Sequence, residues 1–296
     1  MRIVVAGASG LVGSVLVPKL VGERAEVTRL VRSAAGPGEI EWHPDRGTID
    51  APSLEGFNAI INLAGDGIAN GRWTEDKKRR ILESRVNGTR LLSETMAKLS
   101  PKPATFINAS AIGFYGSRGE ELVDEGSGPG EGFLANVCRE WESATAPAEQ
   151  AGIRVVKLRL GVILTRDGGI MGSMLQPFKL GLGGKVGAGK QVISWVAMED
   201  VVAAISFILY HETLRGPINV VAPRPVTNEE FTKTLGRVLS RPTFMAMPAF
   251  AARLAFGEMA DEMMLSSTRV AGKVLNDAGF KFRYPELEGA VRELLR

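Results

Sequence analysis

Val5-Ala6-Gly7-Ala8-Ser9-Gly10-Leu11-Val12-Gly13 follows a short apolar run and opens a segment with a helical pattern. A strand, a glycine turn and a helix in this order form a phosphate site, because glycines let backbone N–H groups approach a pyrophosphate and the helix N-terminus supplies partial positive charge. The alternative is an ordinary turn whose glycines only permit close packing. We predict a dinucleotide site that includes Gly7, Ser9, Gly10, Leu11, Val12 and Gly13.

The bulk composition is that of a globular protein. The chain has 296 residues, of which 45% are hydrophobic and 23% charged, and its formal net charge is +3. This nearly balanced charge argues against nucleic acid or an acidic membrane as a partner. The one cysteine, Cys138, excludes an internal disulfide and suits a reducing, cytoplasmic location. The sequence shows no bilayer-spanning apolar run and no metal-ligand cluster.

Short apolar runs alternate with helical patterns through the first half of the chain. This alternation predicts an α/β fold with a Rossmann-like, doubly wound parallel sheet. Residues Ser33–Phe57, rich in Gly, Pro and Asp, predict a loop with one short strand at most. The expected strands are Arg2–Ala6, Ala25–Val31, Ala59–Leu63, Thr105–Ala109 and Arg154–Leu160, and the expected helices are Leu11–Val21, Glu75–Lys98 and Leu134–Gln150.

The pattern changes after Leu160. Glycines crowd the segment 168–189, and a helix is expected at Glu199–Tyr210, a returning strand at Ile218–Val221 and a capping box at Thr227–Glu230. We therefore predict a dinucleotide-binding domain at residues 1–165. Residues 166–296 would contribute a smaller C-terminal substrate lobe and the closing elements of the sheet.

The end of the second strand indicates which dinucleotide is bound. An acidic residue about twenty positions after the last glycine would bind the ribose 2′-hydroxyl of NAD, but no Asp or Glu lies between Val27 and Gly38. Arg29 and Arg32 flank Val31 there, and a guanidinium can pair with a 2′-phosphate. We predict NADP(H), with Arg32 as the main phosphate contact. The alternative is that both arginines are ordinary solvated residues.

A second cofactor contact is expected where the apolar run Ile60–Asn62 gives way to small residues. Leu63, Ala64 and Gly65 would let adenine or ribose lie against the backbone. The same pattern also fits a buried strand followed by a turn.

Sequence blocks along nearly the whole chain form a recognisable set. Besides the opening glycines, they are Asn62-Leu63-Ala64-Gly65, Arg72-Trp73-Thr74, Glu83-Ser84-Arg85, Phe114-Tyr115-Gly116, Trp141-Glu142, Arg159-Leu160-Gly161-Val162, Gly181-Leu182-Gly183-Gly184, Gln191-x-x-Ser194-Trp195 and Gly279-Phe280-Lys281-Phe282. Together they resemble the extended (epimerase/dehydratase) short-chain dehydrogenase/reductase superfamily. The similarity narrows to an NAD(P)-binding epimerase-like branch with a small C-terminal domain of unassigned function. It implies NAD(P) at the carboxyl edge of a Rossmann-like sheet.

The resemblance also implies single contacts. In extended members, an asparagine before Val-x-Gly-Thr reaches the cofactor, and Arg85 takes that position here, where its guanidinium would contact a pyrophosphate. The alternative is an ion pair of Arg85 with Glu83 or another neighbour. Arg80, Ser110 and Ile163 complete the expected cofactor set.

The Tyr-x-x-x-Lys pair of the superfamily is missing from the sequence. The residues four positions after Tyr115, Tyr210 and Tyr284 are Gly119, Leu214 and Glu288. The helix that should carry the pair has Phe133 or Leu134 near the tyrosine position and Val137 or Cys138 near the lysine position.

Three side chains are candidates for the missing chemistry. Tyr115 follows the fourth strand and is a candidate acid, although in extended relatives it is mainly a pocket residue. Ser110 matches one of two serines in the extended pattern, and Ala111 replaces the other, which is usually the catalytic one. Cys138 is a nucleophile only if its thiolate is stabilised, and buried packing is the alternative.

The glycine-rich stretch Gly181–Gly189 leads to two expected substrate contacts. As a mobile flap, it would let Trp195 stack on a ring and Gln191 bond hydroxyl groups. A hairpin with a packed tryptophan is the alternative. The methionines of Met245–Met264 could line a pocket, and loosely packed core or the face of a homodimer are the alternatives.

The function predicted from these features is that of an NADP(H)-binding epimerase or oxidoreductase. It would transfer hydride to or from a sugar nucleotide or another small carbonyl or hydroxy compound. The alternative is a non-catalytic NADP(H)-binding redox sensor or scaffold, which binds the cofactor without turnover.

Overall fold

The computed structural model describes residues 1–69, 71–166 and 168–296. Its centre is an eight-stranded sheet with the order β12-β8-β6-β5-β1-β2-β3-β4. All neighbours are parallel except β3 and β4, and the chain winds outwards in both directions from β1. The strands are β1 (Arg2–Ala6), β2 (Glu26–Val31), β3 (Glu39–His43), β4 (Thr48–Ile49), β5 (Ala59–Asn62), β6 (Thr105–Ala111), β8 (Arg154–Leu160) and β12 (Gly216–Val220).

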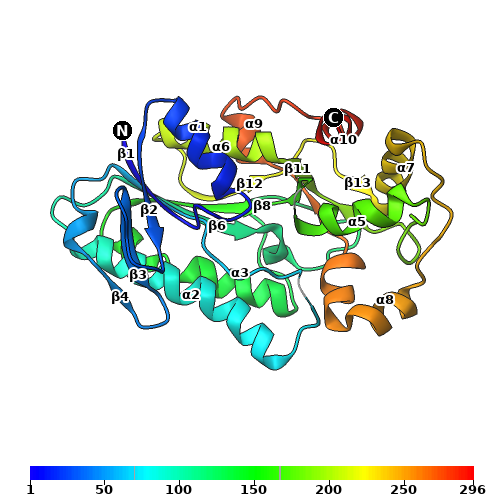
Figure 1. Ribbon diagram of the computed structural model, residues 1–296, viewed down its shortest axis with the longest axis horizontal. Helices are drawn as coiled ribbons and strands as arrows, with labels where there is room; N and C mark the ends of the chain where they lie inside the picture. Colours follow the sequence, from blue (N-terminus) through cyan, green and yellow to red (C-terminus); the bar gives the residue numbers. More distant parts are fainter. Residues whose placement is uncertain (70, 167) are drawn as a thin grey trace.

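Helices cover both faces of this sheet (Figure 1). On one face lie α1 (Gly13–Gly22), α6 (Met198–Tyr210) and α9 (Lys273–Asp277), and on the other lie α2 (Glu75–Lys98), α3 (Phe133–Ser143) and α4 (Ala146–Gln150). Alternate residues of β1 enter the two cores, since Ile3 and Val5 pack towards α1 and Val4 packs towards α2. Strands buried on both faces explain the continuous apolar runs in the sequence.

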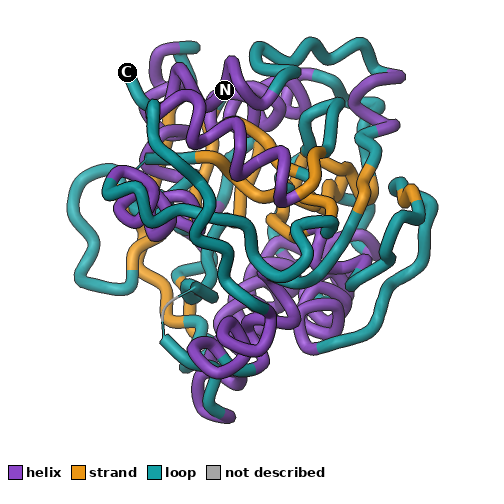
Figure 2. The backbone as a smooth tube through the Cα atoms, turned by 90° about the vertical axis from the view of Figure 1, so that its right-hand side faces the viewer, coloured by secondary structure: helices purple, strands orange, loops and turns teal. Residues whose placement is uncertain are grey.

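The C-terminal region lies largely at one end of the sheet, on the right in Figure 1. It contains α5 (Gly169–Lys179), α7 (Asn228–Leu239), α8 (Ala249–Phe256), the π-helical turn η3 (Ala260–Met264) and α10 (Leu287–Leu294). Figure 2 shows helices above and below the central strands in a second view. Short pairs complete the structure: β9 (Val162–Leu164) with β11 (Trp195–Ala197), β10 (Val192–Ile193) with β13 (Val226–Thr227), and β7 (Leu122–Val123) with β14 (Arg269–Val270).

The predicted α/β fold is confirmed, with differences at particular elements. The expected helix Leu134–Gln150 is two helices, because Pro147 in the first turn of α4 has no N–H to continue the first one. The expected loop Ser33–Phe57 carries two strands and the 3-10 turn η1 (Pro52–Leu54). The capping box is present, with Thr227 and Glu230 bonding each other's backbone N–H. Among the described helices, none combines the length and hydropathy needed to cross a membrane.

Candidate functional site

The opening turn uses its three glycines differently. Gly7 has φ +76°, and a Cβ on it would lie 2.7 Å from the carbonyl carbon of Leu63. A Cβ on Gly13 would lie 2.2 Å from the carbonyl oxygen of Gly7, so both positions require glycine for packing alone. Gly10 is exposed, and its Cβ would meet only the Gly7 oxygen, at 3.2 Å. The turn therefore keeps an open surface at Gly10.

Backbone donors surround that open surface. In the described parts of the chain, the N–H groups of Leu11 and Val12 have no acceptor. Helix α1 follows directly, with no side-chain cap and no acidic residue in its first turn. Unpaired N–H groups and the positive end of a helix favour an anion at this point. Ser9, also exposed, lies on the same turn.

The next strand brings cationic side chains to the same edge of the sheet. Leu30 pairs with Ala6 at the end of β1, so Arg32 lies just beyond the strand end that adjoins the glycine turn. Arg29 and Arg32 are exposed, and neither pairs with a carboxylate of the described residues. Val31 is half-buried between them.

The end of β5 is held by a buried polar network that sequence reasoning missed. The Asn62 side-chain amide donates to Thr89 Oγ1 (2.9 Å) and Asn108 Oδ1 (2.8 Å), and its oxygen accepts from the Ala64 N–H (3.2 Å). These bonds fix the turn Leu63-Ala64-Gly65 against Gly7. Asparagine at the end of an apolar strand is the signal that could have indicated it.

A cleft of about 360 Å³ opens at the carboxyl edge of the sheet. One side is formed by Leu11, Ala111 and the α3 residues Leu134, Cys138 and Trp141, and Arg85 reaches it from α2. Ile163 and the segment 192–194 form another side. Residues 261–263, Ser266 and Thr268 close it from the C-terminal region. Carboxyl ends of parallel strands are where α/β sheets bind ligands.

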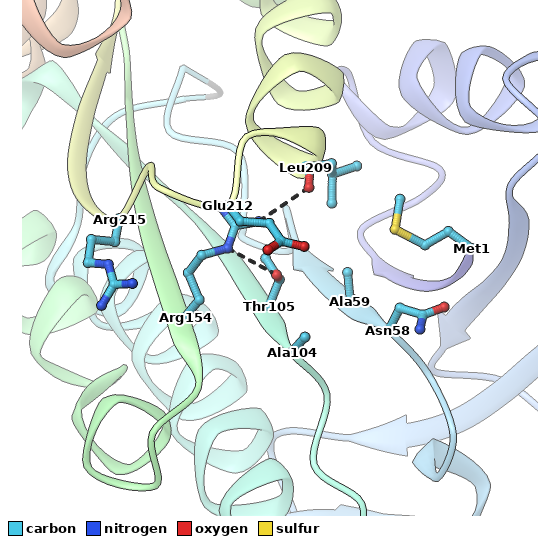
Figure 3. Close-up of a pocket in the computed structure, with 9 residues that line it drawn as sticks. All are labelled: Met1, Asn58, Ala59, Ala104, Thr105, Arg154, Leu209, Glu212 and Arg215. Atoms are coloured by element: carbon cyan, nitrogen blue, oxygen red, sulfur yellow. Dashed lines mark hydrogen bonds between the residues drawn. The ribbon is translucent and has the colours of Figure 1, made fainter. Parts of the chain in front are cut away.

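A second cavity, of about 520 Å³, lies at the opposite edge of the sheet (Figure 3). Of its two arginines, Arg154 and Arg215, the first donates to Thr105 Oγ1 and to the Leu209 carbonyl, as the dashed lines show. The same guanidinium also bonds the carbonyls of Ile208, His211 and Leu214. Arg154 therefore caps the C-terminus of α6, and this cavity is not the ligand site that the strand direction indicates.

Ser110 and Tyr115 face a buried network rather than the cleft. The Ser110 hydroxyl donates to Glu142 Oε1 (2.7 Å), and the Tyr115 hydroxyl donates to Asn219 Oδ1 (2.8 Å) while accepting from Arg159 Nη1 (2.9 Å). Tyr115 is 0% exposed, and burial raises its pKa above the ordinary value. Among the described residues that line the cleft, Gly113 and Gly116 appear but these two side chains do not. This placement corrects the expectation that they act on a substrate.

Comparison with known proteins identifies the family. Residues 3–221 match the NAD dependent epimerase/dehydratase family, and residues 247–294 match a domain of unknown function, DUF1731. The chain belongs to the NAD dependent epimerase/dehydratase family. The resemblance inferred from the sequence blocks is thereby confirmed.

Relatives match over nearly the full chain. An epimerase family protein of Mycobacterium bovis is 43% identical over 283 residues, which cover 95% of this chain and 93% of that protein. The crystal structure of human epimerase family protein SDR39U1 with NADPH has a TM-score of 0.92 and 34% identity, covering 99% of both chains. A nucleoside-diphosphate sugar epimerase from Corynebacterium glutamicum has a TM-score of 0.82 and 36% identity, and the match covers 99% of this chain and 58% of that one.

Within this epimerase-family site, α3 presents no proton donor of the usual type. Of the four residues that the sequence left open for the missing pair, Leu134, Val137 and Cys138 line the cleft, with Leu134 and Cys138 one helical turn apart. Burial raises the pKa of the Cys138 thiol to about 12, so the thiol stays protonated and fits the packing alternative rather than a nucleophile. Ala111, which lines the cleft as well, offers no hydroxyl.

The two arginines predicted on α2 have different surroundings. Arg80 is exposed, and its Nε lies 3.9 Å from Asp66 Oδ2. Arg85 lines the cleft, donates to the Ile81 carbonyl (3.0 Å) and lies over the Trp141 ring at 5.1 Å. Among the described residues, no carboxylate pairs with Arg85, which contradicts the ion-pair alternative.

The side chains of Gln191 and Trp195 are buried and bond backbone carbonyls, so both have structural roles. Trp195 is 0% exposed in a core with α5 and α7, and its indole N–H donates to the Arg224 carbonyl (3.0 Å). Gln191 is buried and donates to the carbonyls of Val186 and Met264. The prediction that Trp195 stacks on a substrate ring and that Gln191 bonds its hydroxyl groups was therefore wrong, because both side chains are packed inside the protein.

The C-terminal region supplies a wall of the cleft through Asp261, Glu262 and Met263, at the end of the methionine-rich segment Met245–Met264. Glu262 accepts hydrogen bonds from the N–H groups of Phe133 (3.1 Å) and Leu134 (3.0 Å) at the start of α3. A Cβ on Gly132, which has φ +106°, would lie 2.3 Å from Glu262 Oε1. Lys78 of α2 pairs with Glu258 at 3.0 Å. Segment 258–262 is thus fixed to both helices that border the cleft.

Proposed function

We propose that this epimerase-family chain binds NADP(H) along the carboxyl edge of its sheet and transfers hydride between the nicotinamide and a small substrate in the cleft. The observation that carries the proposal is the opening turn. Its exposed Gly10 and the unpaired N–H groups of Leu11 and Val12, among the described residues, form a cradle for a diphosphate. The human relative was crystallised with NADPH, which supports the choice of cofactor.

The preference for the phosphorylated cofactor rests on Arg32. Its exposed guanidinium lies one strand away from the glycine turn, as a 2′-phosphate contact requires, and no acidic residue replaces it. Arg29 and Val31 would border the same phosphate. Leu63, Ala64 and Gly65 would support the adenosine half, and Arg80 and Ile163 would flank the bound cofactor.

Because α3 offers no proton donor of the usual type, we propose that the residues of the cleft bind and orient the substrate and that none of the α3 side chains protonates it. The nicotinamide, when bound, supplies or accepts the hydride. Leu134, Cys138 and Trp141 form an apolar wall that excludes water from the reacting carbon. A sugar nucleotide is one substrate class, supported by the likeness to the Corynebacterium epimerase, and another small carbonyl compound is the other.

Calorimetric titration with NADPH and NADH tests the cofactor assignment. We expect NADPH to bind more tightly than NADH. Arg32→Ala should weaken NADPH binding at least about tenfold and change NADH binding little, because only NADPH carries the 2′-phosphate that Arg32 would contact. Arg46→Ala, an exposed arginine on the turn between β3 and β4, is the control. Equal losses for both cofactors in Arg32→Ala would refute the phosphate contact, and no binding of either would refute the function.

A second candidate is the non-catalytic NADP(H)-binding sensor, which Leu134 and Cys138 in the cleft favour. Nicotinamide absorbance, followed with NADPH and a panel of sugar nucleotides, aldehydes and ketones, separates the two. Turnover with any substrate supports the enzyme. Tight binding without turnover across the panel supports the sensor.

We further propose a cytoplasmic location and a homodimer. The reduced, buried Cys138 is compatible with a reducing compartment. Phe244, Met245, Phe250 and Leu254 are exposed apolar side chains at and near α8, which supports a self-association face. Light scattering of the purified chain tests the assembly, and a monomer at all concentrations would contradict it.

A further inference from the structure

Glu262 carries the most enclosed carboxylate of the cleft. The acidic residues that line the cleft are Glu131, Asp261 and Glu262. Asp261 is exposed and pairs with Arg253 at 2.9 Å, and Glu131 is exposed as well. Glu262 is half-buried, and within the described parts of the chain no Lys, Arg or His lies within ion-pair distance of its oxygens. Its charge is therefore not neutralised by a cationic side chain of the described residues.

The hydroxyl groups on the same side of the cleft are less suited to proton transfer. Ser194 Oγ donates to the Thr268 carbonyl (2.9 Å) and accepts from the Val270 N–H (2.9 Å). Thr268 Oγ1 donates to the Gly116 carbonyl (2.7 Å). An unactivated hydroxyl is also a weak base, whereas an ionised carboxylate accepts a proton readily. Glu262 is thus the better proton acceptor of this wall.

The Glu262 carboxylate lies where the missing tyrosine side chain would project. It accepts hydrogen bonds from the N–H groups of Phe133 (3.1 Å) and Leu134 (3.0 Å), the two positions that the sequence left open for that tyrosine. Side chains of an α-helix lean towards its N-terminus. A tyrosine at either position would therefore lean towards the start of α3, which is where the carboxylate is held. Leu134 and Glu262 both line the cleft.

The start of α3 is shaped to receive this carboxylate. A Cβ on Gly132, the N-cap residue with φ +106°, would lie 2.3 Å from Glu262 Oε1 and 3.0 Å from Oε2. The first turn of α3 has no acidic residue of its own, and its N-cap forms no side-chain bond. Each Glu262 oxygen accepts one of the two N–H bonds, and an ionised carboxylate has about four acceptor sites. Both oxygens therefore keep an acceptor site for a substrate.

We propose that Glu262 is the general base of the hydride transfer, in the role of the missing tyrosine, and the general acid in the reverse direction. The proposal rests on the proposed function and names its proton acceptor. The substrate alcohol loses a hydride from its carbon to the oxidised nicotinamide, its O–H bond breaks, and the proton passes to a Glu262 oxygen. The carbon–oxygen bond becomes a carbonyl, and the carboxyl group then releases the proton to water.

Steady-state kinetics with NADP⁺ test this role. The substrate is the alcohol formed from whichever carbonyl compound of the panel the unmodified protein reduces with NADPH. Glu262→Gln should lower kcat at least about a hundredfold, because glutamine has the same shape but accepts no proton at neutral pH. NADPH affinity, measured by calorimetry, should change little. Glu140→Gln, an exposed acid of α3 that does not line the cleft, should leave both quantities unchanged. An unchanged kcat in Glu262→Gln would overturn the proposal.

Rescue by small anions separates proton transfer from capping of α3. Glu262→Ala leaves the N–H groups of Phe133 and Leu134 without their side-chain acceptor. Formate, which is a base, should restore part of kcat in proportion to its concentration. Nitrate, which is similar in size and planar but not basic, should not. Both are added at constant ionic strength maintained with chloride.

Equal rescue by formate and nitrate would show that an anion only caps the helix, and it would overturn the proposal. So would the absence of rescue by formate in a Glu262→Ala variant that still binds NADPH. An unmodified protein that turns over no compound of the panel would instead strike the proposed function itself.

Discussion

Glu142 and Arg159 form a two-bond ion pair in the interior, with Arg159 Nε 2.8 Å from Glu142 Oε1 and Arg159 Nη2 2.9 Å from Glu142 Oε2. Both residues are buried, on α3 and β8 respectively. Ser110 donates a hydrogen bond to Glu142 of this pair, and Arg159 donates one to the Tyr115 hydroxyl. It therefore holds in place the two side chains that the sequence suggested for catalysis.

Removing one partner of this pair should destabilise the protein strongly. Arg159→Met leaves the Glu142 charge buried and unpaired, and we expect a loss of about 3–5 kcal/mol in the free energy of unfolding. The double variant Glu142→Leu, Arg159→Met should recover most of that loss, because no charge then remains unpaired. Urea denaturation measures both. Arg79→Met, which breaks an exposed pair with Asp76, should cost less than about 1 kcal/mol. A double variant no more stable than Arg159→Met would contradict this account.

Substitutions at two glycines of the opening turn should have different effects, one on the stability of the fold and the other on NADPH binding. Gly13→Ala forces a methyl group against the Gly7 carbonyl, and we expect a loss of about 2–4 kcal/mol in stability. Gly10→Ala should cost no more than about 1 kcal/mol, yet weaken NADPH binding at least about tenfold, since its methyl group projects where the diphosphate approaches. Thermal unfolding and calorimetry measure the two effects. Unchanged NADPH affinity in Gly10→Ala would favour the ordinary-turn alternative.

Cys138 should make stability fall at high pH. The folded protein keeps the thiol proton to a pKa of about 12, against an ordinary value of 9.0, because burial opposes the thiolate. Between these values the folded state binds more protons than the unfolded one, so stability is present below pH 9 and declines above it, by up to about 1.4 kcal/mol per pH unit. Urea denaturation between pH 8 and 10.5 should show a shallower decline in Cys138→Ala. Identical slopes, or rapid labelling of the native thiol at pH 8, would contradict the prediction.

The hydrogen bonds of Glu262 to the start of α3 should stabilise the protein. Glu262→Ala removes the acceptor of two N–H groups at the start of α3, and we expect a loss of about 1–2 kcal/mol in the free energy of unfolding. Hydrogen exchange of the Phe133 and Leu134 amides should accelerate as well. Glu131→Ala, an exposed acid just before the same helix, is the matched control. If both variants behave alike, the contact with α3 has no energetic role.

The sequence by itself determined the parallel α/β sheet of the binding half and predicted the cofactor residues of its opening turn, because both rest on local patterns. Glycines in a turn, small residues after a buried strand and an arginine in place of an acid each act within a few residues. The same local reading showed that α3 lacks Tyr-x-x-x-Lys, and the structure places Leu134 and Cys138 in the cleft accordingly. Within Ser33–Phe57 the sequence allowed one short strand, which fits β3, where the buried Ile40 and Trp42 alternate with glutamates, but it did not predict β4 or η1.

Only the tertiary structure decided which polar side chains face the cleft. Tyr115 is turned inwards by Arg159 and Asn219, and the start of α3 is bound by Glu262, 129 positions from Phe133. Trp195 was indistinguishable from a substrate contact until α5 and α7 were seen to enclose it. Among the residues that the structure describes, no carboxylate pairs with Arg85, and the nearby Asp66 is bonded by Lys77 and lies 3.9 Å from Arg80. The direction in which a side chain points depends on packing and charge pairing with residues far away in the sequence, and residue spacing along the chain does not encode these contacts.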